Sequence, residues 1–170
     1  MQTEMTMQGR RFSGTGFVTT VAKTAIGIAE NWLAPVLDLG IRIWVGMVFF
    51  QSGLTKILSW DTTLSLFENE YAVPLLPSNV AAYLGTANEL VLPVFLVLGL
   101  GGRLSAGALF VFNIIAVLSY PDLGEIGLKD HQYWGLLLLV PLLHGPGKIS
   151  VDHFLRRRFL PETMPMQGGR

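Results

Sequence analysis

Cysteine is absent from the 170-residue chain. The chain alone therefore forms no disulfide, performs no thiol chemistry, and neither ligates an iron–sulfur cluster through cysteine nor attaches haem covalently. Its three histidines are scattered, and its acidic residues lie mostly between apolar segments, so no metal site is expected. No cleavable signal peptide is expected either, because Arg10 and Arg11 precede a Gly/Ser/Thr-containing stretch and not a compact apolar core.

Charged residues are also scarce, at 14% of the chain, where a soluble domain carries about 25%. Hydrophobic residues make up 51%, and most of the excess falls in four apolar blocks. The formal net charge is zero, and no nucleic acid is expected among the partners. We therefore predict an all-α integral membrane protein, a four-helix bundle whose first partner is the lipid bilayer.

The order of polar and apolar residues predicts three parts. Residues 1–35 form a polar tail and an amphipathic interfacial helix, which begins at Phe17 and ends before Pro35. Residues 36–155 form the bundle, and residues 156–170 form a basic tail after a short C-terminal helix capped by Ser150. The four spans are expected at about 38–58, 79–100, 104–119 and 132–144, the last with a start near Ile126 left open.

The loops predict the orientation. Lysine and arginine concentrate in the N-terminal segment, at Arg103 and in the C-terminal tail, whereas the other two connections hold six acidic residues and only Lys129. The positive-inside rule then places both termini in the cytoplasm. The run Arg156 to Arg158 is interpreted as a topology anchor, with binding of anionic lipid headgroups as the alternative.

The first span carries one polar face. Arg42, Gly46, Phe49, Gly53 and Lys56 fall on one side of a helix, with the two cations about 21 Å apart along its axis. An ionisable residue inside a span is costly and indicates a functional site. The alternative is that both side chains merely extend to their nearest interface.

The second span carries a carboxylate at depth. Glu89 lies about ten residues inside the span and must be neutralised or paired. Pro93, four residues later, cannot donate a hydrogen bond to the Glu89 carbonyl. Lys56 is the best partner by depth, and the pair has either a functional or a purely structural role. His131 at the start of the fourth span and Asn113 in the third complete a set that we expect around one outward-facing cavity.

Several stretches together resemble the DoxX family of small bacterial four-span membrane proteins. They are the stripe from Arg42 to Lys56, the glutamate of TANEL, and YWGLLLL followed by GPGKISVD, and they extend over residues 36–155. The family's motif positions correspond here to Arg42, Gly53, Lys56, Glu89, Gly145, Pro146, Gly147, Ser150 and Asp152. The N-terminal amphipathic stretch extends beyond the family pattern.

The resemblance implies a place in the bacterial inner membrane. The family includes the membrane subunit of a thiosulfate:quinone oxidoreductase and members associated with oxidative-stress and electrophile defence. We therefore take a quinone-linked redox subunit as the first hypothesis, with quinone as the candidate cofactor. Glu89 would handle protons, His131 would relay them and Lys56 would set the charge of Glu89. Binding residues would be Arg42, Phe49, Gly53, Asn113 and Trp134.

Two other hypotheses stay open, and the sequence does not decide whether the chain is an enzyme. A redox subunit needs a soluble electron donor as partner, because the chain has no cysteine and no visible flavin or nucleotide motif. A membrane scaffold would use the polar pairs for packing and recruit a soluble redox protein. A carrier for a small solute would use Arg42 and Lys56 as counter-ions and act as a homo-oligomer.

Overall fold

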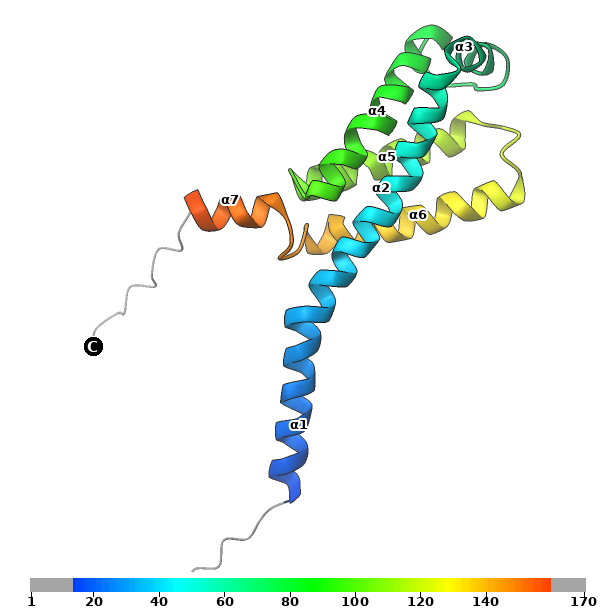
Figure 1. The fold of residues 1–170 in the computed structure, drawn as a ribbon. Coiled ribbons are helices and arrows are strands. Elements are labelled where there is room, and N and C mark those ends of the chain that lie inside the picture. Colours follow the sequence, from blue (N-terminus) through cyan, green and yellow to red (C-terminus); the bar gives the residue numbers. More distant parts are fainter. Residues whose placement is uncertain (1–13, 160–170) are drawn as a thin grey trace, which may run out of the picture. The chain divides into compact units, whose positions relative to one another are not determined.

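The computed structural model describes residues 14–159, and every regular element in this range is helical, so the all-α prediction is confirmed. The predicted polar tail before residue 14 and the basic tail from residue 160 lie outside the described residues. In chain order the elements are α1 (Gly14–Ile28), the π-helix η1 (Ala29–Leu33), α2 (Ala34–Leu58), α3 (Trp60–Asn69), α4 (Ser78–Leu98), α5 (Gly102–Ser119), α6 (Gly124–His144) and α7 (Val151–Phe159) (Figure 1).

The chain divides into two compact units, of which the first ends at Ala34. Its described part consists of α1 and η1, the region where the sequence predicts an amphipathic helix. The amide of Ala34 donates to the Ala29 carbonyl, five residues back, as in a π-helical turn. Large apolar side chains of this unit are exposed, with Phe17 at 75% and Trp32 at 73%. An interfacial position for the helix remains a prediction.

Three helical stretches of the described residues are long and apolar enough to cross a membrane: Phe17–Leu58, Ser78–Leu98 and Gly102–Ser119. A bilayer needs only about 20 apolar residues, so the first is longer than one crossing requires. Helix α6 has 21 residues but carries Glu125, Lys129 and Asp130 in its first two turns. Its role as the fourth span therefore remains a prediction.

The helix that contains the fourth predicted span begins before residue 132. Helix α6 starts at Gly124, close to the alternative start near Ile126 that the sequence left open. Gly124 has a backbone φ of +70°, a conformation that glycine adopts without steric cost and that suits the turn preceding the helix. The polar first turns are accommodated at the surface, where Lys129 and Glu125 form an exposed ion pair of 2.7 Å one turn apart.

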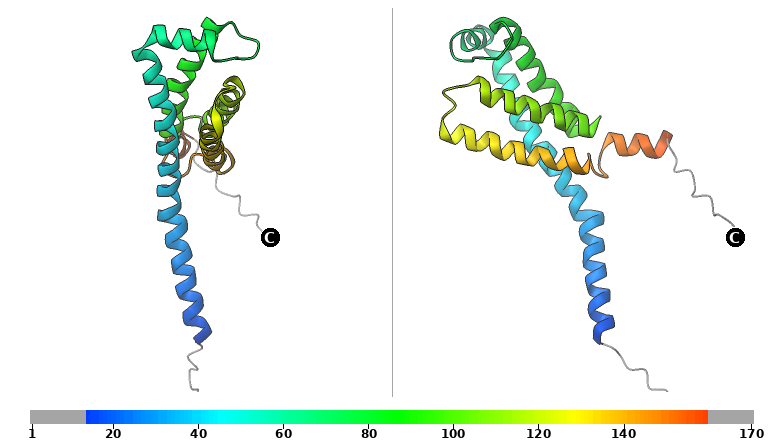
Figure 2. Two further views of the ribbon diagram at one scale, coloured as in Figure 1. Left: turned by 90° about the vertical axis from the view of Figure 1, so that its right-hand side faces the viewer. Right: turned by 180° about the vertical axis from the view of Figure 1, so that it is seen from behind.

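The second unit, from Pro35, holds the main core. Helices α5 and α6 lie side by side in both orientations shown in Figure 2. Buried apolar side chains from four helices form the larger of two clusters: Val45 and Phe49 of α2, Leu96 of α4, Ala106 and Leu109 of α5, and Leu138 of α6. A smaller cluster, in which Phe67 packs on Ala81 and Ala82, holds α3 against α4. These contacts set the positions of the polar residues described next.

Candidate functional site

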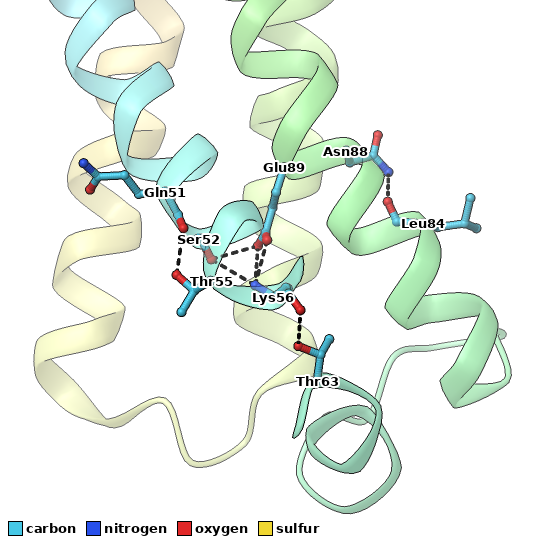
Figure 3. Close-up of polar contacts among 8 residues, drawn as sticks. All are labelled: Gln51, Ser52, Thr55, Lys56, Thr63, Leu84, Asn88 and Glu89. Carbon is cyan, nitrogen blue, oxygen red and sulfur yellow. Dashed lines mark hydrogen bonds and ion pairs between the residues drawn. The ribbon is translucent and has the colours of Figure 1, made fainter. Parts of the chain in front are cut away.

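An ion pair joins α2 to α4 (Figure 3). Lys56 Nζ lies 2.8 Å from Glu89 Oε1 and 2.7 Å from Oε2. It also donates to Ser52 Oγ at 2.9 Å, and Ser52 Oγ donates to Glu89 Oε1 at 3.2 Å. All three N–H groups of the ammonium are thus used. The lysine and glutamate side chains are only 15% and 9% exposed, so the pair that depth predicts is present and largely shielded from solvent.

Local sequence explains why the two helices meet at this point. Ser52 and Lys56 are one turn apart and share the face of α2 that meets α4. Gly53 lies on the same face, where an added Cβ would lie 2.9 Å from the Leu90 side chain and 3.0 Å from Glu89 Cβ. Gly53, predicted as a binding residue, therefore permits close helix contact and does not line the cavity described next.

A cavity of about 450 Å³ opens beside the ion pair, within the range typical of ligand sites. Helices α2 to α6 and the segments between them line it, and its walls are mostly apolar. Phe49 and Trp134 pack edge to face with ring centroids 5.7 Å apart. The His131 ring lies 4.7 Å from Trp134. The polar lining consists of Ser52, Lys56, Tyr71, Asn88, Glu89, Ser119, Tyr120 and His131.

Asn113 forms two hydrogen bonds with His131. Its amide nitrogen donates to the His131 carbonyl at 3.0 Å, and its amide oxygen lies 2.7 Å from His131 Nδ1. Asn113 lines a second, apolar groove of about 460 Å³ between α5 and α6, which His131 also borders. The structure thus brings Lys56, Glu89 and His131 to one cavity, whereas Asn113 contacts His131 but does not line that cavity.

Arg42 lies elsewhere. Its side chain is 1% exposed and donates to the carbonyls of Val97 at 3.1 Å and Leu96 at 3.4 Å, and to the carbonyl of Ile149. The last carbonyls of a helix lack helical partners and carry partial negative charge, which a guanidinium neutralises well. Arg42 was predicted as a binding residue, but it does not line the cavity, and its partners are those of a cap on α4.

Asp152 makes the matching contact with α5. Its two carboxylate oxygens accept hydrogen bonds from the backbone amides of Gly101 at 3.0 Å and Gly102 at 2.8 Å. Its own amide donates to the Gly99 carbonyl at 3.2 Å. Asp152 lies in the first turn of α7, the helix that Ser150 was predicted to cap, yet its carboxylate binds the free amides at the start of α5.

The other residues of the GPGKISVD segment also pack against the α4–α5 turn. Gly145 and Gly147 have φ values of +94° and +73°, which favour glycine. The Pro146 ring packs so tightly on Gly102 that an added Cβ there would overlap the ring. Ser150 Oγ accepts from the amide of His153 at 3.1 Å and so caps α7 as predicted. The segment is a clamp on the α4–α5 turn.

Sequence reasoning missed two tyrosines of the cavity. Tyr71 follows α3 and Tyr120 follows α5, and a hydrogen bond of 2.8 Å from the Ala72 amide to the Ser119 carbonyl brings the two segments together. Their rings lie 5.0 Å apart. Burial raises the pKa of the Tyr71 phenol, with smaller contributions from Tyr120 and Glu89. The phenol is therefore neutral near pH 7 and carries a hydrogen-bond donor. Of the polar cavity residues that were not predicted, only Ser52 could have been found from the sequence, because it lies one turn from Lys56 on the same helix.

Within residues 14–159, no group of three or more His, Asp or Glu side chains is arranged to hold a metal ion. No solved structure matches the chain. An uncharacterized protein of Haemophilus influenzae is similar, with 26% identity over 126 residues that cover 69% of this chain and 82% of that protein. The DoxX family model matches residues 37–121, which run from α2 through α5 and include the Lys56–Glu89 pair. The chain is thus a membrane protein that belongs to the DoxX family.

Proposed function

We propose that the cavity binds the ring of a quinone, and that the chain is a membrane subunit of a quinone-linked redox or oxidative-stress system in the bacterial inner membrane. One observation carries this proposal: a single cavity combines aromatic walls with a shielded ion pair and an imidazole. Sites for planar lipophilic ligands have this composition, in which apolar walls hold the ring and a few polar groups fix its oxygens.

Each lining group has a role in the proposal. Phe49 and Trp134 offer ring faces and edges against which a planar ring packs. Reduction of a quinone to a quinol takes up two electrons and two protons, so the site needs proton carriers next to the ring oxygens. Glu89 exchanges protons, Lys56 sets its charge state, and His131 connects the cavity with the outer end of α6. The chain itself supplies binding, orientation and protons.

The electrons must come from a partner. The chain has no cysteine and no visible flavin or nucleotide motif, so the proposal requires a soluble redox protein with its own cofactor. Positive-inside logic puts both termini in the cytoplasm, and the ion pair and cavity then face the outer half of the bilayer. The donor would act on that side. At the opposite end of the bundle, Arg42 and the clamp formed by the GPGKISVD segment bind the backbone of the α4–α5 turn.

The test uses Trp134 as a reporter of the cavity. The other three tryptophans, Trp32, Trp44 and Trp60, are replaced by phenylalanine, which leaves one indole in the cavity wall. A short-chain ubiquinone or menaquinone is titrated into the purified protein in detergent, and fluorescence quenching is measured. A second protein that keeps only Trp44, which is 64% exposed, reports unspecific quenching by quinone dissolved in the micelle.

Two matched variants locate the effect. Glu89→Gln removes the cavity carboxylate, and Glu125→Gln makes the same change on the exposed pair of α6, where the glutamate is 81% exposed. Saturable quenching of Trp134 that weakens about tenfold or more in Glu89→Gln alone supports the proposal. Saturation that is absent from every variant contradicts it. Capture of a soluble partner without quinone binding would then indicate a scaffold, and solute flux in vesicles without an electron donor would indicate a carrier.

A further inference from the structure

The hydrogen bonds of Asn113 determine which nitrogen of His131 carries a hydrogen. A backbone carbonyl only accepts, so the Asn113 group within 3.0 Å of the His131 carbonyl must be the amide NH₂. The amide oxygen then faces His131 Nδ1 at 2.7 Å. Because a carboxamide oxygen also only accepts, the bond requires a hydrogen on Nδ1. Both Asn113 contacts therefore indicate the tautomer of His131 with its hydrogen on Nδ1.

The consequence concerns the other ring nitrogen. A neutral imidazole with its hydrogen on Nδ1 has an unprotonated Nε2, which is a hydrogen-bond acceptor and a base. Among the described residues, none makes a hydrogen bond to Nε2. The ring lies beside Trp134 in the cavity wall. The site thus keeps one strong acceptor available to a ligand.

We propose that this acceptor selects a hydroxylated aromatic ring, the quinol form of the ligand class proposed above, and that Asn113 is the positioning residue that fixes the tautomer. A quinol donates its O–H to Nε2, whereas a quinone has only carbonyl oxygens and cannot bond to an unprotonated nitrogen. This inference rests on the proposed function, because it assumes that the cavity holds an aromatic ring. It concerns binding only, and no covalent bond is made or broken.

A purely structural role for Asn113 is the competing explanation. Asn113 is 4% exposed and links α5 to α6 through the His131 carbonyl, which would hold the helices together whatever the tautomer. Stability measurements do not separate the two roles, since loss of Asn113 weakens the helix contact in both. The state of the imidazole does separate them, because only the positioning role requires a hydrogen on Nδ1.

The first experiment therefore reads the tautomer directly. The full chain is labelled with ¹⁵N-histidine, which gives signals from only three residues, and His131→Phe assigns the relevant pair. At about pH 8, above the ordinary histidine pKa of about 6.5, we expect His131 to be neutral with its hydrogen on Nδ1. Asn113→Asp should keep this tautomer, because a carboxylate oxygen still accepts there. Asn113→Leu should lose it. A hydrogen on Nε2 in the unsubstituted protein would overturn the inference.

The second experiment measures selection with two ligands that differ only at one group and undergo no redox chemistry. These are 1-naphthol, which donates a hydrogen bond, and 1-methoxynaphthalene, which does not. We expect the protein to bind naphthol about tenfold more tightly, the value of one hydrogen bond. His131→Phe should abolish this preference, so that the two compounds bind equally, while His144→Phe, the same change at the exposed end of α6, should retain it.

The outcomes distinguish this inference from the function on which it rests. Equal binding of the two naphthalenes would refute selection by Nε2 but leave an aromatic site in the cavity. Absence of binding by both naphthalenes and by a short-chain quinone would contradict the proposed function, and the inference with it. A naphthol preference that survives His131→Phe would assign the acceptor to another residue and also refute the inference.

Discussion

The burial of the Lys56–Glu89 pair predicts a strongly non-additive double-mutant cycle. The two side chains are 15% and 9% exposed and lie 2.7 Å apart, so neither charge is well hydrated. Removing one partner of a buried pair leaves the other charge uncompensated and typically costs about 3–5 kcal/mol. We expect Lys56→Met and Glu89→Gln each to lower the free energy of unfolding by about 3 kcal/mol, toward the low end because Lys56 keeps some exposure.

The double variant should be more stable than the sum of its parts predicts. With both charges gone, no unpaired ion remains, and the glutamine can still accept from Ser52, which lies 3.2 Å from the present carboxylate. The cost should fall to about 1–2 kcal/mol, so the coupling energy is about 4–5 kcal/mol. The double variant also offers a folded, uncharged cavity for ligand binding if a single variant proves too unstable to purify.

The chain contains its own control for this cycle. Lys129 and Glu125 have the same 2.7 Å separation, but their side chains are 69% and 81% exposed. Exposed pairs of this spacing contribute about 0.3–0.5 kcal/mol. Both cycles are measured by reversible unfolding in mixed micelles, followed by helical circular dichroism. A coupling energy at Lys56–Glu89 no larger than at Lys129–Glu125 would refute the claim that the pair is shielded from water.

Three further predictions follow from the packing, the clamp and Tyr71. Gly53→Ala should lower the free energy of unfolding by about 1–3 kcal/mol through overpacking. Gly40→Ala in the same helix, where an added Cβ has no atom within 4 Å, should raise it by up to about 1 kcal/mol, and two effects of the same sign would contradict this. Asp152→Asn should cost about 1–2 kcal/mol by weakening the bonds to the first α5 amides, whereas Asp122→Asn at an exposed site should cost little. Burial raises the Tyr71 pKa, so the stability that the neutral phenol contributes is present at neutral pH and is lost as the pH rises above about 10 and through that pKa. Tyr71→Phe should therefore flatten the alkaline loss of stability; an unchanged dependence of the unfolding free energy on pH would refute this.

Depth along the helices was enough to predict the ion pair. Lys56 lies near the end of the first span and Glu89 lies inside the second, and in hydrocarbon two opposite charges at similar depth are stable only as partners. Their helices were predictable because long apolar runs leave few other structures possible in a bilayer. The membrane assignment and the DoxX family were predictable on the same grounds.

Contacts across turns were not predictable in the same way. Arg42 shares the helix face of Lys56, but its partners are backbone carbonyls at the end of α4, which no side-chain pattern marks. Asp152 binds amides of Gly101 and Gly102, some 50 residues earlier in the chain. The position of Tyr71 depends on a loop conformation. Such positions follow from how the loops fold back, and periodicity carries no information on that.

The most direct test of the central claim is to identify the residues that a bound quinone touches. A short-chain azidoquinone is photolysed with the purified protein, and the labelled residues are identified by mass spectrometry, with excess unlabelled quinone as competitor. The account predicts competed labels on cavity-lining residues, above all Phe49 and Trp134, and their loss in the Lys56→Met/Glu89→Gln double variant. Labels that fall only on exposed residues such as Leu104 or Leu143, or that resist competition, would contradict it.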